Sequence, residues 1–361
     1  MDLLRVKKVE VGRIRMEKTD IKSMNLTELT EFMTGTLDES SYRAKQLYEW
    51  MHVRLVTDFD EMTNLSKKLR ERLKQTCNLT KVKMVKRLVS KIDGTRKYLF
   101  ELPDGNVIES VLMQYKHGYS VCVSSQVGCR MGCRFCASTL NGLARNMTAG
   151  EMLEEVYAIQ RDLGERISHV VIMGSGEPLD NYENVVRFIR MLSDEHGLHM
   201  SQRNITLSTC GLVPQIERLA DEDLVITLAV SLHAADDESR KKLMPIANTY
   251  SIAEILRACQ AYYSHNNRRL TFEYSLIAGV NDHNEDAYAL AHLLKGMNAH
   301  VNLIPVNPIK ERDYRSSDGK AVVNFKNKLE KYGEHVTIRR EMGRDIQAAC
   351  GQLRKNYLEE Q

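Results

Sequence analysis

The sequence predicts an α/β protein built around a parallel sheet, with a small helical module in front of it. From about residue 119 onward, six short runs rich in β-branched and aromatic residues alternate with helical patterns, as in a chain of β/α units. Residues 1 to about 90 instead have apolar residues at helical spacing. These patterns alone do not distinguish a curved barrel from an open, doubly wound sheet.

The composition is that of a soluble globular protein, with 361 residues of which 43% are hydrophobic and 27% charged. No apolar run approaches the roughly 18 residues of a membrane-spanning helix. The charged stretch 1–15 also lacks the apolar region of a secretory signal, so we expect no membrane association and a cytoplasmic location. In a reducing compartment, the eight cysteines indicate metal binding or redox catalysis rather than a disulfide scaffold.

The amino-terminal module, residues 1–95, is expected to be helical and basic. Residues 25–37 and 42–56 place apolar side chains on one face of a helix. Between Lys67 and Lys97, twelve Lys or Arg residues stand against two acidic residues. Such a run is either a solvated helix face or a contact surface for a polyanion such as nucleic acid, and charge alone leaves both open.

A β-hairpin is predicted to connect this module to the sheet, over residues 96–118. Two strand-like runs flank the turn sequence Pro-Asp-Gly-Asn. The helix at 148–163 opens with the capping box Thr148-x-x-Glu151. The parallel strands are expected at 119–125, 169–176, 204–211, 225–232, 269–277 and 300–307, with a further strand-like run at 336–341.

Polar or glycine-rich residues follow nearly every predicted strand. They include a cysteine loop after the first strand and the sequence Gly-Ser-Gly-Glu-Pro after the second. Because the carboxyl ends of parallel strands meet at one edge, we expect a single active site there.

Three cysteines of the first loop, Cys129, Cys133 and Cys136, have the spacing C-x3-C-x2-C, and Cys122 lies seven residues upstream. Three thiolates suit a [4Fe–4S] cluster that keeps one iron open. The same cysteine spacing also fits a zinc site with Cys122 as its fourth ligand, or cysteines that are unrelated core residues. The pattern alone leaves these alternatives open.

The run from Cys129 to Cys136, C-x3-C-x-F-C, resembles the cluster motif of radical S-adenosylmethionine (SAM) enzymes. Further blocks, "VVIMGSGEPLDN", "ITLSTCG", "VSLHA", "VNLIPVNP" and "DIQAACGQL", occur in the order seen in the RlmN/Cfr family of radical SAM RNA methyltransferases. The resemblance covers nearly the whole chain. It implies a partial (β/α)6 barrel over residues 119–345 and an RNA-binding role for residues 1–95.

The resemblance also implies the cofactor ligands. Cys129, Cys133 and Cys136 would hold a [4Fe–4S] cluster, whose open iron chelates SAM. Further SAM contacts are implied for Gly176, Glu177, Ser208, Ser231, Leu232, His233 and Asn307. Without the resemblance, His233 would be interpreted as a hydrogen-bonded core histidine.

Three catalytic roles are implied as well. Cys350, in the carboxy-terminal segment 346–361, corresponds to the cysteine that carries the methyl group, Cys122 to its transient disulfide partner, and Glu109 to the proton acceptor. The chemistry consumes two SAM molecules per turnover. One methylates Cys350, and the other yields the radical that activates this methyl group for addition to an adenine carbon.

The implied substrates are an adenine of 23S rRNA and the adenine next to the anticodon in certain tRNAs. Gly176-Glu177-Pro178 favours methylation at C2, with C8 methylation of the rRNA as the alternative. An electron donor such as flavodoxin or ferredoxin and a monomeric enzyme are expected. Less favoured alternatives are a zinc-dependent RNA-binding module without catalysis and a radical SAM enzyme acting on a small molecule or peptide.

Overall fold

The computed structural model describes residues 18–353; the charged stretch 1–15 and residues 354–361 of the predicted carboxy-terminal segment lie outside the described residues. The fold is centred on one ten-stranded sheet with the order β14-β13-β12-β11-β10-β9-β6-β5-β4-β3. Strands β6 and β9 to β14 run parallel. Strands β3, β4 and β5 extend the sheet in antiparallel fashion.

The parallel strands lie where the sequence predicts them. They are β6 (Gly118–Val123), β9 (Ile167–Ile172), β10 (Ile205–Thr209), β11 (Thr227–Ser231), β12 (Leu270–Leu276), β13 (Ala299–Pro305) and β14 (Val336–Ile338). Within the described chain β14 does not pair with β6, so the curved sheet stays open and forms a partial barrel. The prediction of a partial radical SAM barrel is confirmed.

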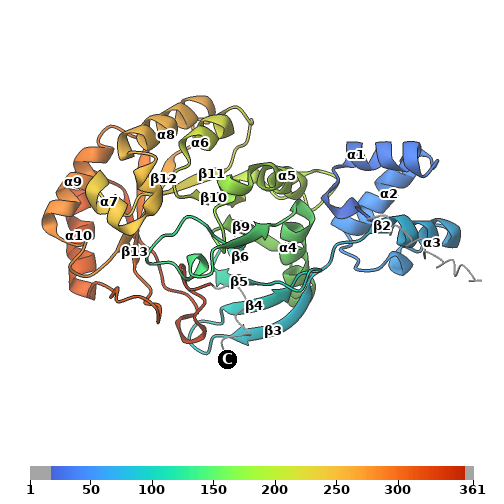
Figure 1. Ribbon diagram of the computed structural model, residues 1–361, viewed down its shortest axis with the longest axis horizontal. Coiled ribbons are helices and arrows are strands. Elements are labelled where there is room, and N and C mark those ends of the chain that lie inside the picture. Colours follow the sequence, from blue (N-terminus) through green and yellow to red (C-terminus); the bar gives the residue numbers. More distant parts are fainter. Residues whose placement is uncertain (1–17, 354–361) are drawn as a thin grey trace, which may run out of the picture.

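Helices follow the strands, and most of them lie along the outer side of the curved sheet (Figure 1). They are α4 (Ala149–Leu163), α5 (Tyr182–Ser193), α6 (Val213–Ala220), α7 (Asp237–Leu243), α8 (Ile252–Asn266), α9 (Asn284–Leu294) and α10 (Gly319–Lys331). The predicted capping box is present, because the Thr148 side chain accepts from the Glu151 amide and the Glu151 carboxylate accepts from the Thr148 amide.

The amino-terminal module contains α1 (Leu26–Glu31), α2 (Ser41–His52) and α3 (Lys67–Thr76), and it lies to one side of the barrel (Figure 1). A short parallel pair, β1 (Thr19–Asp20) with β2 (Cys77–Asn78), closes it. The prediction of helix up to residue 95 is wrong for Lys83–Val89, which forms strand β3. Strand β3 is an edge strand that is mostly exposed, so it lacks the apolar alternation of a half-buried strand.

The predicted hairpin is present as β4 (Arg96–Glu101) and β5 (Val107–Tyr115). Together with β3 it forms a three-stranded extension of the barrel sheet. Lys97, which belongs to the basic run of the sequence, is fully buried in this extension rather than on the surface. The basic surface is therefore made by the other residues of that run.

Several polar contacts join the amino-terminal module to the barrel helices, and three of them involve buried side chains. The Lys22 ammonium pairs with Glu154 of α4 at 2.5 Å, with both side chains fully buried. The Tyr48 hydroxyl donates to Asp194 at 3.0 Å, and the His52 ring lies 2.9 Å from the hydroxyl of Tyr157. The module is thus docked firmly on the barrel. Over the described residues, the helices include none with the length and apolar character to cross a membrane.

Candidate active site

The cysteine loop is closed at its base by a two-stranded sheet, β7 (Gln126–Gly128) with β8 (Leu143–Asn146). Gly128 has a φ of 78°, and a β-carbon there would come within 2.0 Å of the Gly142 oxygen. Only glycine fits this close approach. The Cys129 amide then donates to the same oxygen at 3.1 Å, so the loop begins at a fixed point.

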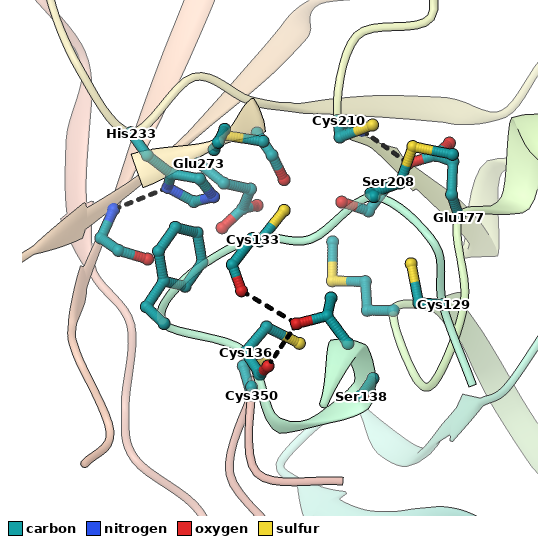
Figure 2. A pocket seen from close by; sticks show the side chains of 18 of the residues that line it. Cys129, Cys133, Cys136, Ser138, Glu177, Ser208, Cys210, His233, Glu273 and Cys350 are labelled. Atoms are coloured by element: carbon teal, nitrogen blue, oxygen red, sulfur yellow. Dashed lines mark hydrogen bonds between the residues drawn. The ribbon is translucent and has the colours of Figure 1, made fainter. Parts of the chain in front are cut away.

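The three cysteines of this loop line one cavity at the carboxyl ends of the parallel strands. Figure 2 shows the sulfur atoms of Cys129 and Cys133 directed into it, with Cys136 next to Cys350. Burial raises the pKa of Cys129 to about 12 and also raises the pKa values of Cys133 and Cys136. Buried thiols of this kind keep their protons unless a metal cation displaces them.

These thiols fit an iron–sulfur cluster better than a single metal ion. Within residues 18–353, no three Cys, His, Asp or Glu side chains converge closely enough to hold one ion. In a [4Fe–4S] cube each thiolate binds a different iron, so the sulfurs stay further apart. Cys122 lies away from this group, because it lines a second cavity and not the first. It is therefore poorly placed to be a fourth zinc ligand.

The Gly-Ser-Gly-Glu-Pro loop after β9 forms one wall of the first cavity. Gly176 has a φ of 107°, and a β-carbon there would lie 2.8 Å from the backbone nitrogen of Gln126. The Glu177 carboxylate is buried and accepts from the amides of Cys210 at 2.7 Å and Leu179 at 3.0 Å. Burial raises its pKa. A carboxylate has further acceptor positions, so Glu177 can still bind a ligand ammonium.

Most of the other predicted SAM contacts also line this cavity, namely Ser208, Ser231, His233 and Asn307. Leu232 does not; its side chain is fully buried in the core. The His233 Nδ1 atom accepts from the Ser275 amide at 2.9 Å, which leaves its proton on Nε2. Burial lowers the pKa of His233 to about 3, so the ring is neutral, and it packs edge-on against Phe135.

Cys350 lies between two cavities, because it lines both the first cavity and the one behind it. Cys122, on β6, lines only the second. Both cysteines are free thiols. Burial raises the pKa of Cys122 well above its usual range, and the neighbouring Cys350 adds to this while Arg339 opposes it. The two thiols predicted to pair therefore share one cavity, on the side away from the three-cysteine loop.

Glu109, the predicted proton acceptor, is fully buried on β5 and lines neither cavity. It lies on the same face of β5 as Val111 and Met113, which line the second cavity. The Ser124 hydroxyl donates to the backbone oxygen of Glu109 at 2.8 Å and accepts from the Ser175 amide at 3.0 Å. The strand of Glu109 is thereby tied to the glycine-rich loop.

Sequence reasoning missed two charged residues of the cavity wall, Glu273 and Arg339. Glu273 is buried on β12, and burial raises its pKa. Arg339 lines both cavities, with Nη1 3.6 Å from the Glu273 carboxylate. Cys350 and then Glu273 raise the pKa of Arg339. A charged residue inside the apolar run of β12 was the one signal available in the sequence.

This cysteine loop, at the rim of an open parallel barrel, defines a radical SAM enzyme. The sequence profile of the Radical SAM superfamily matches residues 123–291. A second profile, the ribosomal RNA large subunit methyltransferase N-terminal domain, matches residues 19–79. The first profile covers the barrel from the end of β6 into α9, and the second covers the helical module.

Curated relatives identify the family. Two relatives carry the name "Probable dual-specificity RNA methyltransferase RlmN". The protein from Lachnospira eligens is 60% identical over 95% of this chain and 97% of its own length. The protein from Lachnoclostridium phytofermentans is 61% identical over 95% of this chain and 96% of its own length. The crystal structure of a radical SAM methyltransferase from Sphaerobacter thermophilus superposes with a TM-score of 0.90 and 44% identity, covering 93% of this chain and 99% of that one. The chain therefore belongs to the RlmN family of radical SAM RNA methyltransferases.

Proposed function

We propose that this enzyme methylates C2 of an adenine in 23S rRNA and of the adenine next to the anticodon in certain tRNAs. One observation carries the proposal. Cys350 lines two adjoining cavities, one with the three cluster cysteines and the other with Cys122. A methyl carrier must meet SAM on one side and a resolving thiol on the other, and a position between these two cavities supports that role for Cys350. The name of the relatives and Gly176-Glu177-Pro178 support the two substrates and C2.

The residues of the first cavity would hold the cofactors. Cys129, Cys133 and Cys136 are the ligands we propose for one [4Fe–4S] cluster per subunit. When bound, the cluster supplies the electron for reductive cleavage of SAM. The proposed SAM contacts are Gly176, Glu177, Ser208, Ser231, His233 and Asn307, whereas Leu232, which the resemblance also implies, has its side chain in the core and does not line this cavity. A flavodoxin or ferredoxin as electron donor, a monomeric state and a cytoplasmic location complete the proposal.

The residues of this chain act in three steps. The Cys350 sulfur first takes a methyl group from SAM, and loss of a hydrogen atom from this group lets its carbon add to adenine C2. Glu109 then accepts the C2 proton, and the adduct also gives up its unpaired electron, for which the cluster that Cys129, Cys133 and Cys136 would hold is the one-electron acceptor, so that a closed-shell adduct remains. Finally the Cys122 thiolate attacks the Cys350 sulfur, so an S–S bond forms while the S–C bond breaks. The freed carbon takes up a proton and leaves as the methyl group of the RNA, and a thiol reductant restores both cysteines.

The Cys122→Ala variant tests this sequence of steps. It retains Cys350 and the first cavity, so it should methylate Cys350 and react with RNA, yet fail to release the product. A covalent protein–RNA adduct should then accumulate, visible as a shifted band on a denaturing gel. Cys259→Ala is the matched control, because Cys259 is buried in α8 and lines neither cavity. Normal turnover by Cys122→Ala would remove Cys122 from the mechanism.

The regiochemistry is tested separately. Mass spectrometry of nucleosides from 23S rRNA and tRNA of a deletion strain should show loss of 2-methyladenosine, restored by the wild-type gene. Loss of 8-methyladenosine instead would assign the alternative C8 reaction. This test does not depend on which cysteine resolves the adduct.

A further inference from the structure

Lys97 of β4 and Glu109 of β5 form a fully buried ion pair. The Lys97 Nζ atom lies 3.1 Å from Oε1 of Glu109, and neither side chain has exposed surface. In the strand register Lys97 is opposite Val111 and Glu109 is opposite Leu99, so the two charges are diagonal neighbours on one face of the sheet. Burying such a pair costs desolvation energy that apolar residues of similar size would avoid. Stability alone therefore does not account for this pair.

The same ammonium also contacts the carboxy-terminal segment. Lys97 Nζ donates to the backbone oxygen of Gln347 at 3.2 Å, three residues before Cys350. In Figure 1 this last described segment runs beside β3 and β4. Lys97 is thus in contact both with the proposed proton acceptor and with the loop that carries the proposed methyl carrier.

We propose that Lys97 is a positioning residue for the proton transfer to Glu109, an inference that rests on the function proposed above. An ammonium at this distance favours the ionised form of a carboxyl group. Only the carboxylate can accept the ring proton. Lys97 therefore holds Glu109 charged, and holds it in place, before the adenine is attached to Cys350.

The proton transfer changes the charge of the pair. The C2–H bond breaks, its electron pair stays with the adenine ring, and the proton bonds to a Glu109 oxygen. Glu109 is then neutral, and Lys97 is left as a buried cation without its countercharge, which is unfavourable. This favours passage of the proton from Glu109 to water and restores the ion pair for the next turnover.

A purely structural role for Lys97 is the competing explanation, because other residues tie the same loop to the sheet extension. The Ser90 hydroxyl donates to the Asp345 carboxylate at 2.6 Å, and the Gly343 amide donates to Asp93 at 3.0 Å. Ser90→Ala removes one of these ties without touching Glu109. It is therefore a matched control for loop docking alone.

The test compares Lys97→Met with Ser90→Ala in the cluster-loaded, full-length enzyme with substrate RNA. Lys97→Met should methylate Cys350 to the wild-type extent, measured by mass spectrometry of the Cys350 peptide. Its protein–RNA adduct should then accumulate and decay at least about tenfold more slowly, within the range of general acid–base effects. Lys97→Arg should restore part of this rate. Ser90→Ala should accumulate no adduct; equal behaviour of Ser90→Ala and Lys97→Met would overturn the proposal.

A double variant covers the case in which Lys97→Met fails to fold with an unpaired buried carboxylate. Lys97→Met/Glu109→Gln has no buried charge at either position. If Lys97 acts through Glu109, adduct decay in the double variant should equal that of Glu109→Gln alone. If Lys97→Met slows adduct decay in the Glu109→Gln enzyme by the same factor as in the wild type, the two residues act independently and the proposal is overturned.

The outcomes separate this inference from the proposed function. If Glu109→Gln turns over normally, Glu109 is not the proton acceptor and the inference is overturned with it. If Glu109→Gln accumulates adduct while Lys97→Met releases product at the wild-type rate, the proposed function stands and only the role of Lys97 is refuted.

Discussion

The Asn307 side chain donates a hydrogen bond of 2.9 Å from Nδ2 to the backbone oxygen of Cys350. Asn307 follows β13 and lines both cavities, as Cys350 does. A residue proposed to contact SAM is therefore also a tether for the loop of the proposed methyl carrier. Occupation of the SAM pocket and the position of Cys350 should be linked through this one side chain.

Asn307→Ala should weaken both SAM binding and the attachment of the Cys350 loop. Loss of a hydrogen bond worth about 0.5–1.5 kcal/mol predicts a roughly 2- to 12-fold slower methylation of Cys350 and weaker SAM binding. Both are measurable on the cluster-loaded enzyme, by mass spectrometry and by equilibrium binding. Asn307→Asp should be at least as defective, because a carboxylate cannot donate to the Cys350 oxygen. Wild-type methylation of Cys350 in both variants would show that this tether is unimportant.

Cys133→Ala should abolish cluster binding, because a cube held by two thiolates loses one of its three protein ligands. The measurements are iron and sulfide content and the brown visible absorbance after anaerobic reconstitution. Cys77→Ala, which replaces a buried cysteine outside both cavities, should retain all three. A fully loaded Cys133→Ala enzyme would contradict the ligand assignment, and stoichiometric zinc in the wild-type protein would favour the non-catalytic alternative.

The positions of the parallel strands along the sequence could be predicted because their signals are local. The capping box of Thr148 and Glu151 marks one helix start, and each parallel strand is a short apolar run. Strand β3 was not predicted because it lies on an exposed edge and lacks an apolar alternation. Its charged residues Lys83 and Arg87 instead form ion pairs with Glu101 of β4 and Asp162 of α4. Residues 83–89 form a strand because they pair with β4, and their own sequence carries no sign of that partner.

The site divides in the same way. The three cysteines of one loop and the glycine-rich loop of Gly176 are compact sequence features, so their shared cavity was predictable. Arg339 and Glu273 are 66 positions apart in the sequence and meet only because β12, β13 and β14 lie side by side. The charge of Glu273 inside the apolar run of β12 is a local signal, but no local pattern indicates that its partner is Arg339.

His52 should make the protein sensitive to acid. Burial, and secondarily Lys22, lower the pKa of His52 to about 3, against about 6.5 in an unfolded chain. As the pH falls, the unfolded state thus binds the proton before the folded state does. The folded protein keeps its full stability above pH 6.5, where His52 is neutral in both states, and loses stability as the pH falls from 6.5 toward 3. Between pH 6.5 and pH 5 the free energy of unfolding of the wild type should therefore fall by about 2 kcal/mol more than that of His52→Gln.

Urea unfolding at these two pH values measures the difference. His196→Gln replaces an exposed histidine of the same chain and should behave as the wild type does. Equal pH dependence of His52→Gln and the wild type would mean that His52 does not remain neutral in the folded state.

The basic run of the amino-terminal module should contribute to RNA affinity. Lys67, Lys68 and Lys81 are exposed and take part in none of the ion pairs among residues 18–353. Free surface cations of this kind bind phosphates and release counterions from the RNA. The triple charge reversal to Glu should therefore weaken binding several-fold at low salt. It should also reduce the slope of log affinity against log salt by about 0.7–0.9 for each lost phosphate contact.

The control is the same charge change on the other side of the barrel. Lys295, Lys320 and Lys331 are exposed at α9 and α10, far from α3 in Figure 1. Their reversal produces an equal change in net charge, so it reports the effect of the overall field alone. Filter binding of substrate RNA across a salt series compares the two triple variants. A specific loss in the Lys67, Lys68 and Lys81 variant identifies an RNA contact, whereas equal losses in both assign the effect to net charge, and no loss in either makes the basic run a solvated surface.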